Sequence, residues 1–152
     1  MAWGSQASQG GGFLGALGSH YIDCLRDWFG EIARVSGAVS IQDPERVDPE
    51  SGKRAQADGD DTFGFLVEFQ KGGWASMTAS NAAPFGPGAR IEIYGTEGTL
   101  QTLQPGVNPQ ADGVVLGARF GDGEGVQELP MPERHRPFDD DRAEMMMAFR
   151  IL

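Results

Sequence analysis

The chain has 152 residues, of which 39% are apolar and 22% charged, proportions that indicate a globular protein with a core of ordinary size. Its formal net charge of −10 argues against nucleic acid and anionic membrane surfaces as partners, because both select clustered Lys and Arg. No apolar run has the length of a membrane span, the first residues lack the pattern of a signal peptide, and Cys24 is the single cysteine. We therefore expect a cytoplasmic protein without disulfides.

Hydrophobic periodicity predicts a helix over residues 11–29. Its apolar side chains recur at spacings of three and four and share one face, namely Leu14, Leu17, Tyr21, Cys24, Leu25 and Trp28. The opposite face is small or polar, with Ala16, Ser19, His20, Asp23, Arg26 and Asp27. Gly30 is the expected C-cap.

Strands are predicted after this helix. Small and β-branched residues mark a first strand over 33–41, and the polar segment 42–61 is expected to be a long surface loop. Apolar and polar residues alternate from 62 to 70, which places Phe63, Phe65, Val67 and Phe69 on one face. Lys71-Gly72-Gly73 then turns the chain into a second strand over 74–81 and closes a hairpin.

Two further strand pairs are predicted, one within 90–103 around the turn 96–98 and one joining 114–120 to 126–129. A last helix is expected to begin at 139–141 and to reach Leu152 without a stop signal. We therefore expect residues 1–152 to be a single domain cut from a longer protein at both ends. The succession of hairpins predicts an α+β fold, an open and predominantly antiparallel sheet with helices packed on one face.

Gly10, Gly12 and Gly15 have the G-x-G-x-x-G spacing of loops that cradle a dinucleotide pyrophosphate. That motif requires a buried strand before the glycines, whereas the preceding MAWGSQASQ is short and polar. We therefore interpret the glycines as a structural helix start, where missing side chains allow another backbone or a ligand to approach closely.

The segment GGGFLGALGSHYIDCLRDWFGEIARVSG resembles the start of the C-terminal domain in the glucose–fructose oxidoreductase, inositol dehydrogenase and rhizopine-catabolism (Gfo/Idh/MocA) family. Asp60-Asp61-Thr62, Gly72-Gly73 and IEIYGTEGTL continue the resemblance in order, to about residue 103. It implies the substrate and oligomerisation domain of an oxidoreductase that uses NAD or NADP. In this family a separate Rossmann domain holds the cofactor, so none is expected to bind this chain alone.

The resemblance also implies site residues for a sugar, polyol or related small carbonyl compound as substrate. His20 matches the active-site histidine of the family, and an imidazole suits proton removal from a hydroxyl group. Ser19 and Asp23, in the same G-S-H-x-x-D block, are expected near the substrate. Trp3 and Asn81 are weaker candidates, since a loose chain end explains Trp3 better and ordinary turn chemistry explains Asn81 equally well. No metal-ligand spacing is visible, and His135 is expected to be solvated.

One position departs from the family pattern. Most members carry an aspartate four residues before the histidine, whereas this chain has Ala16. Asp23 could partly replace that aspartate, or it could be a solvated partner of Arg26. The complete protein is thus an enzyme with a different acid–base arrangement, or a non-catalytic dimerisation and interaction domain of the same fold. We also expect a homodimer through a sheet face bearing Trp74 together with Phe63, Phe65 and Phe69.

Overall fold

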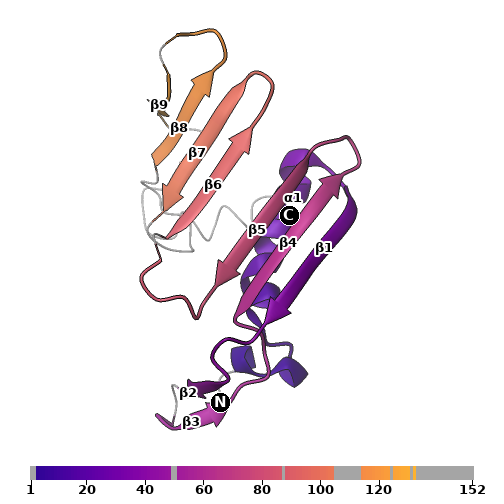
Figure 1. Cartoon of the computed structure of the whole chain (residues 1–152), viewed down its shortest axis with the longest axis vertical. Helices are drawn as coiled ribbons and strands as arrows, with labels where there is room; N and C mark the ends of the chain where they lie inside the picture. The colour runs from indigo at the N-terminus through magenta and orange to yellow at the C-terminus, as the bar shows by residue number, and fades with distance from the viewer. Residues whose placement is uncertain are drawn as a thin grey trace. The chain divides into compact units, whose positions relative to one another are not determined.

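The structure is a computed structural model that describes residues 3–48, 51–86, 88–104, 114–123, 125–130 and 132 (Figure 1). The chain divides after Phe85 into two compact units. The first contains η1 (Trp3–Ser5), η2 (Ala7–Gln9), η3 (Leu14–Gly18), α1 (Ser19–Phe29), β1 (Ile32–Ser40), β2 (Glu45–Val47), β3 (Arg54–Gln56), β4 (Thr62–Phe69) and β5 (Trp74–Ser80). The second contains β6 (Ala89–Tyr94), β7 (Gly98–Gln104), β8 (Val114–Arg119) and β9 (Gln127–Leu129).

The predicted helix of the first unit is confirmed, with one irregularity at its start. Its first turns, η3, form a π-helix, and α1 continues from Ser19 to Phe29. Gly30 ends the helix with a φ of 88° and donates its N–H to the carbonyl of Arg26 at 2.8 Å. The apolar face is half-buried except at Trp28, which is 48% exposed and makes an edge-to-face contact with Phe29.

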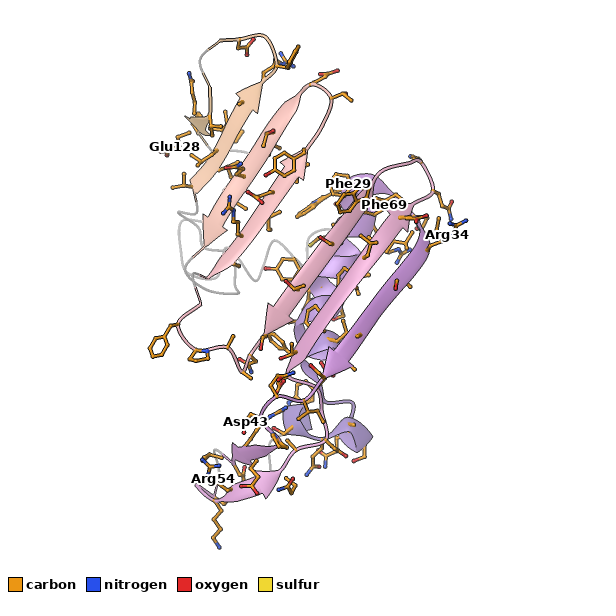
Figure 2. The ribbon with its side chains drawn as sticks, viewed as in Figure 1. Phe29, Arg34, Asp43, Arg54, Phe69 and Glu128 are labelled. Carbon is orange, nitrogen blue, oxygen red and sulfur yellow. The ribbon has the colours of Figure 1, made fainter. Side chains whose placement is uncertain are left out.

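Three strands in the order β1-β4-β5 form an antiparallel sheet, and α1 crosses one of its faces (Figure 1). Aromatic rings join the helix to the sheet. The ring centroids of Phe13 and Phe63 are 5.7 Å apart, and those of Phe29 and Phe69 are 5.4 Å apart. Figure 2 shows the last two rings together at one end of the sheet. Alternation along β4 thus places the predicted apolar face under the helix, and its residue Val67 is the most deeply buried side chain described.

Trp74 lies on the other face of this sheet, contrary to the prediction that it shares a face with the three phenylalanines. Its register partner on β4 is Glu68, and directly opposed residues of antiparallel strands point to the same side. Trp74 is 70% exposed, and Leu66 on the same face is 43% exposed. The same face also carries an exposed ion pair, with Arg34 Nη1 3.5 Å from Glu68 Oε2. Its remaining side chains are small, and a shallow depression on it is lined partly by Ser40, Thr62, Gly64, Thr78 and Ser80.

The segment predicted as a loop over 42–61 contains a short antiparallel hairpin, β2-β3. Its polar composition hid the strands, because they lack the apolar alternation by which a half-buried strand is recognised. A buried ion pair ties the hairpin to the start of β4, with Arg46 Nη2 3.0 Å from Asp61 Oδ2. The hairpin therefore depends on a charged anchor more than on a core of its own.

The second unit contains a four-stranded antiparallel sheet in the order β6-β7-β8-β9. Both predicted strand pairs are confirmed, with Ile93 opposite Leu100 and Val115 opposite Leu129. With the first unit, this gives the predicted mixed fold of antiparallel sheets and a helix. The helix expected from residue 139 lies outside the described residues.

Candidate functional site

The outward side of α1 carries the polar residues predicted for the site. Gly18 faces the sheet so closely that a Cβ on it would lie 3.1 Å from the ring of Phe63. At 3.6 residues per turn, His20 two positions later points to the opposite side. The imidazole is exposed, and no hydrogen bond or ion pair is recorded for it within the described ranges.

Ser19 and Asp23 flank His20 on this exposed side. The Ser19 hydroxyl donates to the carbonyl of Gly15 at 2.7 Å, so one of its functions is to satisfy the preceding turn. Asp23 is not the main partner of Arg26, because that guanidinium is 2.8 Å from Glu31. The hydrogen bond to Glu31 is the largest cause of the raised pKa of Arg26, and the charge of Asp23 adds a smaller contribution.

Ala16, one helical turn before His20, is also exposed. A methyl group there supplies no acceptor for the imidazole. The outward side therefore carries His20 and two neighbouring hydrogen-bond acceptors, Ser19 and Asp23. It has no carboxylate one helical turn before the histidine.

Trp3 and Asn81 are not linked to His20 by any hydrogen bond, ion pair or ring contact in the part of the chain that the structure describes. Trp3 lies in η1, 58% exposed, with its carbonyl accepting the N–H of Gln6. Asn81 is exposed just after β5, and its N–H donates to the carbonyl of Asp61 at 2.8 Å. The structure thus groups Ser19, His20 and Asp23 on one side of α1, and these two candidates make no contact with His20 among the described residues.

Groups of the protein itself lie against Gly11 and Gly12, whereas the motif residue Gly10 has open space around it. A Cβ on Gly11 would lie 2.2 Å from the carbonyl oxygen of Trp3, and one on Gly12 would lie 2.2 Å from Asp60 Oδ1. The other carboxylate oxygen of Asp60 accepts the N–H of Leu14 at 2.8 Å. The structural interpretation of the glycines is therefore confirmed at Gly11 and Gly12, where a backbone carbonyl and a carboxylate of the protein itself approach closely.

Sequence reasoning missed the part played by Asp58 and Asp60. Asp58 Oδ1 accepts the N–H of Ala7 at 2.7 Å, and both main-chain and side-chain oxygens of Asp60 hold the start of the helix. Asp60 is 46 residues from Leu14, so no local pattern connects them. The available signal was the run of aspartates just before β4, together with a helix that has no Ser, Thr, Asp or Asn cap of its own.

Cys24 is half-buried on the inward side of α1. Burial is the largest cause that raises the pKa of its thiol, and the nearby charges of Asp23 and Asp27 raise it further, which disfavours a nucleophilic thiolate.

Among the described residues, no three His, Cys, Asp or Glu side chains are grouped to hold a metal ion. None of the helices described has both the length and the apolar character needed to cross a bilayer.

Three similar proteins place these features in context. The uncharacterized oxidoreductase sll0816 of Synechocystis sp. is 29% identical over 133 residues, 87% of this chain and 36% of that protein. An NAD binding oxidoreductase from Klebsiella pneumoniae is 26% identical with a TM-score of 0.72, over 88% of this chain and 35% of that one. Levoglucosan dehydrogenase, in complex with NADH and L-sorbose, gives the same identity and TM-score, over 88% of this chain and 36% of that one.

The chain spans about a third of the length of these relatives. The sequence profile described as the GFO/IDH/MocA C-terminal domain matches residues 1–101, which include the glycine segment, α1 and the whole β1-β4-β5 sheet. The match therefore contains Ser19, His20 and Asp23 in their structural setting. On this evidence, the chain belongs to the GFO/IDH/MocA oxidoreductase family, of which it is a C-terminal domain.

Proposed function

We propose that this chain is the substrate-binding and oligomerisation domain of a cytoplasmic NAD- or NADP-dependent oxidoreductase that acts on a sugar, a polyol or a related small carbonyl compound. The observation that carries the proposal is the exposed imidazole of His20 on the outward side of α1, within the matched family domain. The relative solved with NADH and L-sorbose supports both the cofactor and the substrate class.

His20 removes a proton in this proposal. When the alcohol carbon is oxidised, its O–H bond breaks and the imidazole accepts the proton, as a general base does. Ser19 and Asp23 are placed to contact neighbouring hydroxyl groups of the substrate. A nicotinamide cofactor, which another domain would hold, would supply the hydride acceptor. Alone, the chain is expected to bind neither NADH nor NADPH.

The test is the complete protein, assayed for reduction of NAD or NADP with a panel of sugars and polyols. Replacing His20 by Ala should lower kcat/KM by about 10²–10⁴-fold, the range for loss of a general base. His135→Ala is the matched control, because it removes the other histidine of the chain, and it should keep activity. An active enzyme that His20→Ala leaves unchanged would exclude the catalytic role.

A non-catalytic interaction domain is the second candidate, and Ala16 favours it. An enzyme of this family with no carboxylate beneath the histidine has lost one means of orienting the imidazole. The two candidates differ in one measurement: a folded complete protein that binds NADH but oxidises no member of the panel supports the interaction domain.

Self-association through the open face of the β1-β4-β5 sheet completes the proposal. The helix covers the opposite face, whereas Leu66 and Trp74 are exposed on this face beside the Arg34–Glu68 ion pair and several small residues. Exposed apolar groups on a sheet face of this kind favour contact with another protein surface. We expect a homodimer in which two copies of this face pack together.

A further inference from the structure

The helix that carries His20 begins without a capping side chain of its own. At its N-terminus, neither Phe13 nor Gly18 makes a side-chain cap. The free N–H groups are satisfied instead from a distant segment: Phe13 donates to the main-chain oxygen of Asp60 at 2.9 Å, and Leu14 to its carboxylate at 2.8 Å. Asp60 therefore caps the N-terminus of this helix, a function that a Ser, Thr or Asp close in sequence usually performs.

Gly12 makes room for this arrangement. Its φ of 129° lies in a region that side chains disfavour, and any Cβ would collide with Asp60 Oδ1. The carboxylate thus occupies a hollow formed by the glycine backbone. Gly10, by contrast, has open space around its Cα, so the close approach is confined to the residue that meets Asp60.

Hydrogen bonds connect Asp60 to the residue before His20. The N–H of Leu14 donates to Asp60, and the carbonyl of the same Leu14 accepts the N–H of Ser19 across the π-helical turn. The Ser19 hydroxyl bonds back to Gly15 within the same turn. A π-helical turn is rare and occurs often at functional sites. Here Asp60 accepts a hydrogen bond at the N-terminal end of the turn. This turn sets the position of the first residues of α1, which include His20.

We propose that Asp60 is the positioning residue of His20, acting through Leu14 and Ser19 to hold the imidazole where it receives the substrate proton. The inference rests on the proposed function of His20. Asp60 contacts no substrate in this scheme, and its carboxylate acts as a hydrogen-bond acceptor more than as a charge near the reaction.

The experiment compares three variants of the complete protein, each first shown to fold by circular dichroism. Asp60→Ala removes the acceptor, and we expect it to lower kcat by about ten- to a hundredfold with little change in KM, as misplacement of a catalytic group does. Asp60→Asn keeps an acceptor oxygen and should restore most of kcat. Asp58→Ala is the matched control, because Asp58 holds Ala7 in η2 and not the helix of His20.

A second readout is independent of activity. The nuclear magnetic resonance signals of the His20 ring, and hydrogen exchange at the Leu14 and Ser19 amides, should change in Asp60→Ala and stay as in the unmodified protein in Asp58→Ala. An unchanged His20 signal in Asp60→Ala overturns the inference, as does an Asp60→Asn variant as slow as Asp60→Ala. If His20→Ala leaves activity intact, the proposed function fails, whereas the ring signals still decide whether Asp60 positions the imidazole.

Discussion

At the scale of single residues, Asp61 is the most heavily bonded carboxylate that the structure describes. It is 3% exposed and accepts hydrogen bonds from the amides of Gln42 and Asp43, the Thr62 hydroxyl and Arg46. Burial alone raises the pKa of Asp61, but these donors outweigh burial and leave its pKa below the ordinary value. The ionised form is therefore the one that stabilises the fold.

The sign of the pH dependence follows from this lowered pKa. The stabilisation is complete above the unfolded pKa of about 3.9 and is lost as the pH falls through the lower folded value. Asp61→Asn should reduce the free energy of unfolding at neutral pH by about 3–5 kcal/mol, because it leaves Arg46 without its buried partner. It should also flatten the acid side of the stability curve. Urea denaturation across the acid range measures both effects, and an unchanged curve would contradict them.

At the scale of elements, an aromatic pair joins the end of α1 to the end of β4. Phe69 is 7% exposed and meets Phe29 across the interface (Figure 2). Phe69→Ala should lower the free energy of unfolding by about 3–5 kcal/mol, from lost burial and the cavity that remains. Trp74→Ala is the control on the open face, where it should change monomer stability by less than about 0.5 kcal/mol. Equal losses in the two variants would show that the faces were assigned wrongly.

At the scale of the whole molecule, the open sheet face predicts the oligomeric state. Leu66→Arg places a charge in the proposed interface and should convert the dimer to a folded monomer, since an unpaired charge opposes association. Val35→Arg is the control, because Val35 is 69% exposed on the helix-bearing side of the same sheet. Light scattering distinguishes the outcomes: a monomeric unmodified protein, or a dimer that Leu66→Arg leaves intact, contradicts the interface.

The sequence by itself determined the elements whose signals are local. Apolar spacing predicts the helix ending at Gly30, and alternation with Lys71-Gly72-Gly73 predicts the β4-β5 hairpin, because neighbouring side chains alone set these periods. The polar side of α1, with His20, follows from the same helical period. Each of these patterns predicts which side chains share one face of a helix or strand. None of them predicts which other part of the chain packs against that face.

Only the tertiary structure decided the contacts made across long stretches of chain. Register with Glu68 placed Trp74 on the open face, although the sequence had suggested that it shares a face with Phe63, Phe65 and Phe69. Asp60 meets Gly12 and Leu14 because β4 brings its preceding loop beside the helix start. Such pairs depend on how strands align and loops close. A residue's type and its neighbours therefore indicate that a carboxylate needs donors, whereas the fold determines which donors it finds.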